Sequence, residues 1–207
     1  MMPVLILARH GNTFEKDQTP TWVGARTDLP LTSEGEEQGQ ALAKMLTDSY
    51  FPLGGILAGP LLRTKQFAEI ISEKANNVFT IDERITEIDY GLWENKSKKE
   101  IVALYGLEIL EKWEKDGAWP NNMNWAPSRK KLEQNIQHFM EEQYKKLTTP
   151  EALNRVIVTS NGILRFIYRQ LTGKAPDKTA KVKTGHYCVL APTSNGWEIK
   201  LWNEKPN

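Results

Sequence analysis

The 207-residue sequence contains a single cysteine, Cys188. One cysteine excludes an internal disulfide and offers no cysteine cluster for a zinc ion. Because Cys188 lies within an apolar run, we expect it to be buried in the core. The sequence therefore predicts neither a disulfide framework nor a metal site.

Long apolar runs and an excess of either charge are also missing. No segment approaches the roughly 18 apolar residues of a membrane-spanning helix. The N-terminal apolar run has no basic residue before it and soon reaches Arg9, so we expect no signal peptide. The 27 basic and 26 acidic residues nearly cancel, which gives no bias toward a polyanion. We expect a cytoplasmic protein that binds neither membranes nor nucleic acid.

Short apolar segments alternate with helical patterns along the chain. Buried strands are predicted at 4–8, 55–58, 78–81 and 155–159, and helices at about 33–48, 61–74, 128–147 and 163–171. Ser33 and Glu36 predict a capping box for the first helix. Asn195-Gly196 predicts a hairpin near the end of the chain. We expect one α/β domain over residues 1–207, with a mostly parallel central sheet and helices on both faces.

Residues 95–130 read as an insertion in this pattern. Its last part, residues 117–127, has little periodicity and contains two tryptophans, two prolines and three asparagines. This composition suits a lid or rim over a pocket. Docking of the two tryptophans into the protein's own core is an equal alternative.

The strongest candidate for chemistry follows the first strand, where Arg9-His10-Gly11 ends the apolar run. Ligands of open α/β sheets bind at the carboxyl ends of the strands. Arginine presents a fork of donors that matches phosphate or carboxylate, and a neutral histidine can act as a nucleophile near pH 7. A surface Arg-His pair in a loop is the competing interpretation.

Three further segments carry polar residues in similar places. Arg63 lies in the first turn of a predicted helix just after a strand, where an anion is favoured. Residues 85–94 hold three carboxylates among apolar neighbours, which raise the pKa of a carboxylic acid and suit it to act as a general acid. Ser160-Asn161-Gly162 connects the fourth strand to a helix. For Arg63 taken alone, a solvated helix arginine is the better interpretation. Solvation of a loop is the alternative for the carboxylates, but their mixture with Gly91 and Trp93 fits it less well.

Taken in order, these motifs resemble those of the histidine phosphatase superfamily, which includes the cofactor-dependent phosphoglycerate mutases. The resemblance covers about residues 4–190. It rests on Arg9 to Thr13, the run from Arg26 to Gln38, Pro60 to Ala68, Glu87 to Glu94, and Val158 to Arg165. Each motif is short, but five in this order and spacing are specific.

The resemblance implies a role for each matching residue. His10 would attack phosphorus, Arg9 and Arg63 would hold the phosphoryl oxygens, and Glu87 would protonate the leaving group. Asn12 and Thr13 would add hydrogen bonds to the phosphate. No metal and no cofactor are implied, because the arginines supply the positive charge.

One position departs from the family pattern. Ungapped alignment places Ser160 where the family carries its second histidine, and Asn161 where it carries a glycine. A serine or asparagine donor could serve the phosphate in its place, and His186 is a second source of an imidazole, although a structural role suits His186 better. Loss of this cationic contact leaves open a pseudoenzyme that binds phosphate and turns over slowly.

The resemblance implies a phosphoglycerate mutase-like fold and a substrate that is a small phosphorylated metabolite. We favour a phosphatase that hydrolyses a small phosphomonoester through a phosphohistidine. Phosphoglycerate mutase-type phosphotransfer is the alternative, but the chain lacks a proline-rich substrate segment and its insertion is short. A monomer and a homodimer are both compatible with the sequence.

Overall fold

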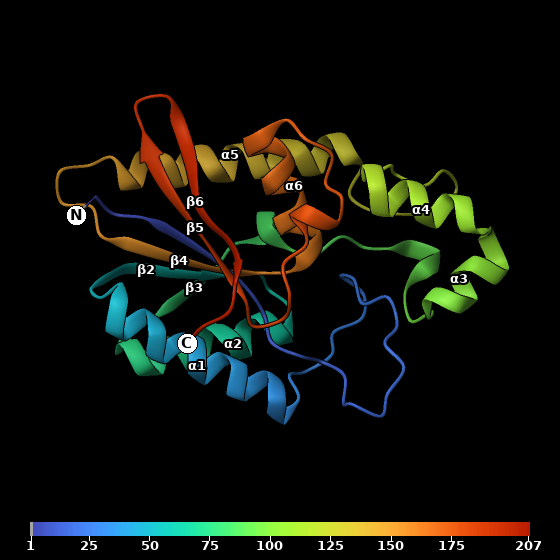
Figure 1. Ribbon diagram of the computed structural model, residues 1–207, viewed down its shortest axis with the longest axis horizontal. Helices are drawn as coiled ribbons and strands as arrows, with labels where there is room; N and C mark the ends of the chain where they lie inside the picture. Colours follow the sequence, from blue (N-terminus) through green and yellow to red (C-terminus); the bar gives the residue numbers. More distant parts are fainter. Residues whose placement is uncertain (1) are drawn as a thin grey trace.

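The computed structural model describes residues 2–207 and is built around a six-stranded sheet (Figure 1). The strand order is β3-β2-β4-β1-β5-β6. The strands are β1 (Leu5–Arg9), β2 (Leu53–Ala58), β3 (Phe79–Ile81), β4 (Asn154–Thr159), β5 (Tyr187–Thr193) and β6 (Gly196–Glu204). The first four pair in parallel, whereas β5 and β6 are antiparallel to their neighbours. The prediction of a mostly parallel sheet is therefore confirmed.

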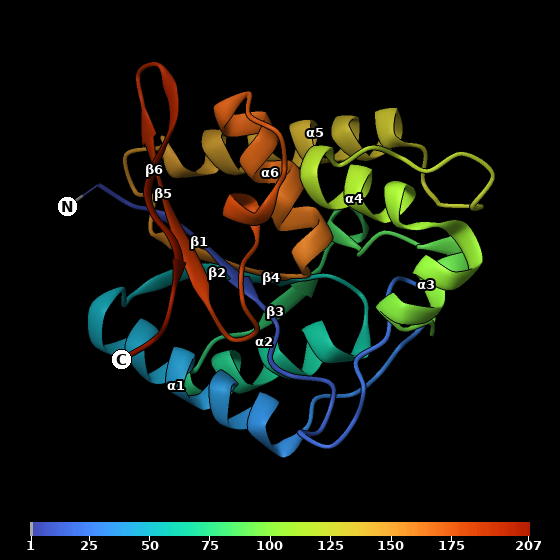
Figure 2. The ribbon, with the colours of Figure 1, turned by 45° about the vertical axis from the view of Figure 1, so that its right-hand side comes forward.

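Helices cover both faces of the sheet, as predicted (Figures 1 and 2). The helices are α1 (Ser33–Ser49), α2 (Leu62–Ala75), α3 (Lys98–Tyr105), α4 (Leu107–Asp116), α5 (Arg129–Leu147) and α6 (Asn161–Thr172). Alternate residues of β1 point to opposite faces. Leu5 and Leu7 pack in the core that includes α5 and α6, and Ile6 and Ala8 pack in the core that includes α1 and α2. No helix within residues 2–207 is long and apolar enough to cross a membrane.

Two local predictions can be compared directly with the structure. The N-cap of α1 is Thr32 rather than Ser33, and the Thr32 side chain accepts a hydrogen bond from the Gly35 amide. The capping-box prediction was wrong: the cap lies one residue earlier, and the third helical residue is then Gly35, which has no side chain to complete a capping box. Cys188 is fully buried, as predicted, and this burial raises the pKa of its thiol to about 12.

The inserted segment forms α3, α4 and the loop that follows. In this loop, Trp119 and Trp125 point toward the interior: their ring centroids lie 6.0 and 4.8 Å from that of Trp113 in α4. Trp125 belongs to the same core cluster as Trp113, and Trp119 packs against it. Of the two alternatives for this loop, docking of the tryptophans into the core is the one observed.

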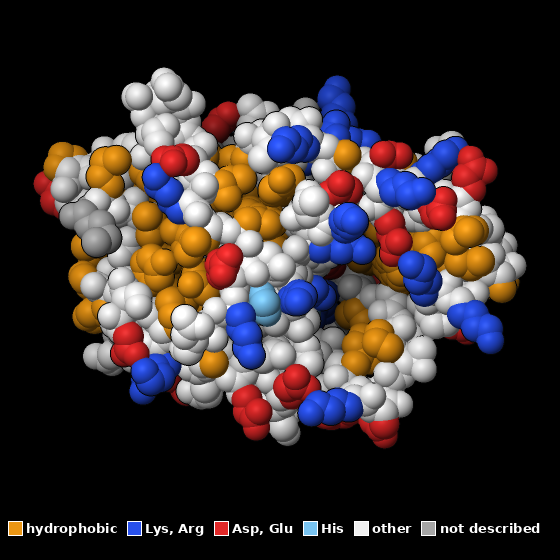
Figure 3. All heavy atoms as spheres, viewed as in Figure 1, with side chains coloured by type: hydrophobic (Ala, Val, Ile, Leu, Met, Phe, Trp, Pro, Cys, Tyr) orange, Lys and Arg blue, Asp and Glu red, His pale blue; other side chains and the backbone are white. Residues whose placement is uncertain are grey.

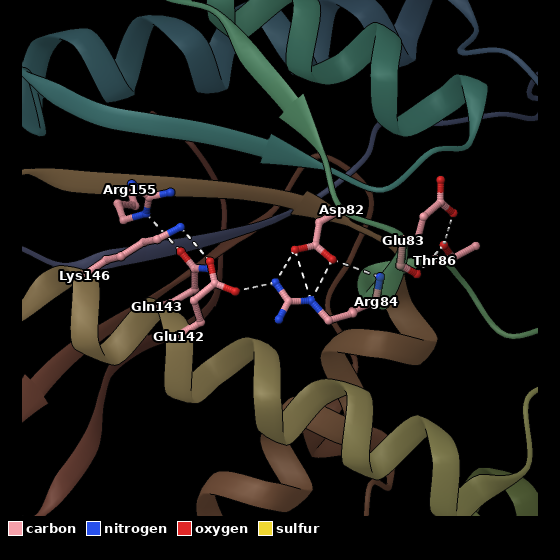
Figure 4. Close-up of polar contacts among 8 residues, drawn as sticks. All are labelled: Asp82, Glu83, Arg84, Thr86, Glu142, Gln143, Lys146 and Arg155. Carbon is pink, nitrogen blue, oxygen red and sulfur yellow. Dashed lines mark hydrogen bonds and ion pairs between the residues drawn. The ribbon is translucent and has the colours of Figure 1, made fainter.

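A polar network ties the sheet edge to α5 (Figure 4). Arg84 lies in the short 3₁₀ helix η1 (Glu83–Ile85). Its Nη2 lies 2.7 Å from a Glu142 carboxylate oxygen in α5, and its Nε donates to Asp82 at 2.9 Å. Lys146 also pairs with Glu142, and these two cations lower the pKa of that carboxyl to about 2. The network fixes η1, which leads directly into the segment that carries Glu87.

Candidate active site

The carboxyl ends of β1 and β4 lie side by side at one edge of the sheet. Arg9 and Thr159 are register partners, and the His10 amide donates to the Thr159 carbonyl at 3.1 Å. A cavity of about 670 Å³ opens at this edge. The predicted site residues that line it are Arg9, His10, Asn12, Thr13, Arg63, Glu87 and Asn161. The structure thus brings together residues from four separate segments of the chain.

The His10 imidazole is held in one orientation at the wall of this cavity. Its Nδ1 lies 2.8 Å from the Gly11 carbonyl, which can only accept a hydrogen bond, so Nδ1 carries the hydrogen. Burial lowers the pKa of His10 well below its ordinary value, and the nearby charges of Arg63 and Arg9 lower it further. The ring is therefore neutral near pH 7, and Nε2 keeps a free lone pair.

Arg9 and Arg63 carry positive charge without acidic partners. Arg63 is 1% exposed, and its guanidinium donates to the carbonyls of Thr27 and Gly24 at 3.0 and 3.2 Å. Arg9 donates through Nη1 to the Val182 carbonyl at 2.7 Å, and its buried Nε has no hydrogen-bond partner among residues 2–207. Neither arginine forms a salt bridge within that range. Both charges are therefore available to an anion in the cavity.

Glu87 is the one carboxylate of segment 85–94 that lines the cavity. Its two oxygens accept hydrogen bonds from the amides of Ile88 at 2.9 Å and Gly162 at 3.1 Å. Burial raises the pKa of Glu87 despite these bonds and despite both nearby arginines. By contrast, Asp89 pairs with Arg26, and Glu94 accepts hydrogen bonds from backbone amides of the surrounding loops.

Gly162 lets the Glu87 carboxylate reach the start of α6. A Cβ at this position would lie 2.1 Å from a Glu87 oxygen and 2.7 Å from the Tyr90 hydroxyl. Any larger residue would have to push the acid out of its place.

A comparison with known protein families shows which family the chain belongs to. Residues 5–205 match the profile described as the histidine phosphatase superfamily, branch 1. The chain belongs to this superfamily.

Some relatives of the chain are named as phosphatases and others as phosphoglycerate mutases. The chain is 27% identical to phosphoserine phosphatase 1 of Hydrogenobacter thermophilus, over 83% of this chain and 77% of that protein. It is 32% identical to a Salmonella choleraesuis protein named "Probable phosphoglycerate mutase GpmB", over 52% of this chain. The match spans only 46% of that mutase-named protein. The match to an Arabidopsis thaliana protein named "Probable 2-carboxy-D-arabinitol-1-phosphatase" spans 27% of that protein, so the chain spans less than half the length of these two relatives.

Solved structures agree with the fold. A mycobacterial glucosyl-3-phosphoglycerate phosphatase superposes with a TM-score of 0.83 at 20% identity, covering 98% of this chain and 99% of that one. At this level of identity the similarity establishes the fold alone.

The end of β4 carries Ser160 and Asn161, the two positions at which we expect the sequence to depart from the superfamily pattern. Ser160 is 1% exposed, its hydroxyl has no hydrogen-bond partner among residues 2–207, and it is not among the residues that line the cavity. Asn161 does line the cavity. Its Oδ1 accepts a hydrogen bond from the Val182 amide at 3.0 Å, so its Nδ2 donor is directed elsewhere.

His186, the other source of an imidazole, does not line the cavity. Its Nδ1 lies 3.0 Å from the Asn203 carbonyl of β6, and its own carbonyl accepts a hydrogen bond from the Arg9 amide. His186 therefore supports the start of β5. Within residues 2–207, no group of three or more histidine, cysteine, aspartate or glutamate side chains is arranged to hold a metal ion.

Sequence reasoning missed part of the cavity wall. Arg165, Lys181 and Trp113 line the cavity, and the backbone of Val182 anchors both Arg9 and Asn161. One signal for Arg165 was present, because it is a charged residue inside the apolar run of α6. Backbone groups such as those of Val182 leave no mark in the sequence.

Proposed function

We propose that this protein is a phosphatase that hydrolyses a small phosphomonoester through a phosphohistidine at His10, without a metal ion. The observation that carries the proposal is the neutral His10 ring, which keeps a free Nε2 beside two buried arginines that have no acidic partners. Few other reactions need an uncharged nitrogen nucleophile in a pocket of fixed positive charge.

In the first step, His10 Nε2 attacks phosphorus, an N–P bond forms, and the bond between phosphorus and the leaving oxygen breaks. Arg9 and Arg63 stabilise the charge on the phosphoryl oxygens. Glu87, whose raised pKa favours the protonated form, gives its proton to the leaving alkoxide. In the second step, Glu87 takes a proton from water, the water oxygen attacks phosphorus, and phosphate leaves as His10 is restored.

Asn161 supplies the donor that the superfamily's second histidine would otherwise provide. This assignment is supported by the Val182 amide, which fixes the Asn161 oxygen and leaves its Nδ2–H group for a ligand. An amide is neutral, so the phosphoryl charge depends more heavily on Arg9 and Arg63 here than in a site with two histidines.

A second candidate function is phosphate binding with little turnover. It is favoured by one observation: Ser160 and Asn161, the side chains at the end of β4, are both neutral. Mutase-type phosphotransfer would use the same first step with a second alcohol in place of water. The cytoplasmic location, and the choice between a monomer and a homodimer, stay predictions.

The test is turnover of p-nitrophenyl phosphate in the presence of a chelator, combined with trapping of the phosphoenzyme. We expect turnover and an acid-labile, base-stable phosphate on the protein. Binding of inorganic phosphate without turnover or labelling would support the second candidate. Turnover that requires an added divalent metal would contradict the mechanism.

A further inference from the structure

Arg165 is a buried cation without a carboxylate partner. It is 2% exposed, and its Nε and Nη2 donate to the backbone carbonyls of Pro176, Trp113 and Glu114. Within residues 2–207 it forms no salt bridge, and its Nη1 makes no hydrogen bond. Buried charges are normally paired, because the loss of hydration is costly. Since Arg165 also lines the active-site cavity, its missing partner can come from a ligand.

Lys181 adds a second positive charge to the same wall. It lines the cavity, and its Nζ lies 3.8 Å from a Glu114 carboxylate oxygen. The other Glu114 oxygen lies 3.3 Å from Lys98. The Glu114 carboxylate is thus shared by two lysines, while Arg165 contacts only the backbone carbonyl of Glu114. Figure 3 shows blue side chains gathered beside the hollow on this face of the molecule.

This positive wall lies on the leaving-group side of the reacting centre. Glu87 must face the leaving oxygen in order to protonate it, and it accepts a hydrogen bond from the Gly162 amide at the start of α6. Arg165 follows Gly162 by three residues in α6, so the two positions lie on the same side of the helix, about one turn apart. The alcohol part of the substrate begins at the leaving oxygen, so it extends from Glu87 into the part of the cavity that Arg165 and Lys181 border.

We propose that Arg165 and Lys181 form a second anion subsite, and that the substrate is a phosphomonoester whose alcohol part carries another oxyanion. The shared chemistry is a carboxylate or a second phosphate. This inference rests on the proposed phosphatase function. It explains why a buried guanidinium is kept at the cavity wall with only uncharged partners, namely backbone carbonyls and the Trp113 ring, whose centroid lies 4.5 Å from its Cζ.

The test compares three substrates with the same carbon skeleton: glycerol 3-phosphate, 3-phosphoglycerate and glycerol 1,3-bisphosphate. p-Nitrophenyl phosphate serves as the reference without a second anion. We expect kcat/KM of the parent protein to be at least about tenfold higher for one of the two doubly anionic substrates than for glycerol 3-phosphate. The substrate that is preferred identifies the oxyanion as carboxylate or phosphate.

Lys181→Met should lower kcat/KM for the preferred substrate about tenfold more than for p-nitrophenyl phosphate, mainly through KM. Lys183→Met is the matched control, because Lys183 is an exposed lysine of the same loop and does not line the cavity. It should leave all four substrates unchanged. Arg165→Gln should enlarge the same difference, and the Lys181 result does not depend on whether that variant folds.

The anion subsite and the proposed phosphatase function would be overturned by different results. Turnover of p-nitrophenyl phosphate without any preference among the three glycerol-type substrates would overturn the anion subsite and leave the phosphatase intact. An equal loss on all substrates in Lys181→Met would also overturn the subsite. No turnover of any substrate by the parent protein would overturn the proposed function itself.

Discussion

The ends of β1 and β4 face the same cavity but are built in opposite ways. At the end of β1, His10 presents a neutral imidazole and Arg9 a cation, both held by hydrogen bonds to backbone carbonyls. At the end of β4, Ser160 and Asn161 are neutral, and the Ser160 hydroxyl has no partner among residues 2–207. In the proposed mechanism, the nucleophile and one phosphate-binding arginine therefore come from β1. The end of β4 contributes a neutral donor and the start of α6.

The largest expected effect comes from replacing His10, the proposed nucleophile at the end of β1. His10→Ala should reduce turnover by several orders of magnitude and abolish the phosphoenzyme, because within residues 2–207 His10 supplies the one imidazole that lines the cavity. Phosphohistidine trapping with a labelled substrate measures this directly. His186→Ala is the control and should still form the phosphoenzyme. A labelled His10→Ala protein would show that the nucleophile has been misassigned.

A smaller loss should follow from Glu87→Gln, which keeps the side-chain shape but removes the proton. Alkyl phosphates should lose about 10²- to 10⁴-fold in kcat, because their poor leaving groups need general-acid assistance. Aryl phosphates should lose much less in the phosphorylation step. Single-turnover measurements on both classes give the comparison. An equal loss on both would assign the proton to another group.

The contributions of Ser160 and Asn161, the two neutral residues at the end of β4, to phosphate binding can be measured separately. Asn161→Ala should weaken binding of inorganic phosphate about tenfold or more, because a hydrogen bond to a charged ligand is worth about 1.5–3 kcal/mol. Ser160→Ala should leave binding within about twofold, since its hydroxyl does not line the cavity. Calorimetric titration with phosphate measures both.

Asn161→Asp tests more directly whether the Asn161 side chain faces the phosphate. It retains an acceptor for the Val182 amide but replaces the Nδ2 donor with a negative charge, so phosphate binding should fall further than in Asn161→Ala. If the aspartate variant binds phosphate as well as the parent protein, the Asn161 side chain does not face the ligand.

The smallest expected effect is a change with pH in the free energy of unfolding. The folded-state pKa of His10 lies well below its ordinary value of 6.5. Below pH 6.5 the unfolded chain therefore takes up a proton that the folded protein does not, and stability is lost as pH falls toward the folded pKa. The wild-type free energy of unfolding should fall relative to that of His10→Gln by at most about 1.4 kcal/mol per pH unit.

Urea unfolding of both proteins at pH 7 and at about pH 5.5 gives this difference. A parallel change in the two proteins would mean that His10 is protonated in the folded state as well. Its assignment as a neutral nucleophile would then fail.

The sequence predicts the fold well because its buried strands are short apolar runs with sharp ends. The predicted strand 155–159 and helix 128–147 differ from β4 and α5 by a single residue at one end. The candidate site follows from the same regularity, since parallel strands bring their carboxyl ends to one edge of the sheet. His10, Arg63 and Glu87 are found around one cavity for this reason.

Contacts that depend on irregular segments could not be predicted in this way. Arg165 faces the cavity because α4 and the Pro176 carbonyl hold its guanidinium there, and no periodic pattern encodes that packing. The orientation of Trp119 and Trp125 likewise depends on how their loop returns to the core. Val182 binds the side chains of Arg9 and Asn161 through its backbone carbonyl and amide, and these backbone groups are the same in every sequence.

The position of β1 between β4 and β5 has a consequence for the order in which the fold is assembled. The strand β1 precedes both of its neighbours in the sheet, and helices α1 to α5 lie between it and β4 in the chain. Arg9 and the Val182 carbonyl that holds it are 173 positions apart in the chain. Such distant pairings close late in folding. On the ribosome, the growing chain therefore carries His10 without the rest of the cavity wall until β4 and β5 have been made and have joined β1.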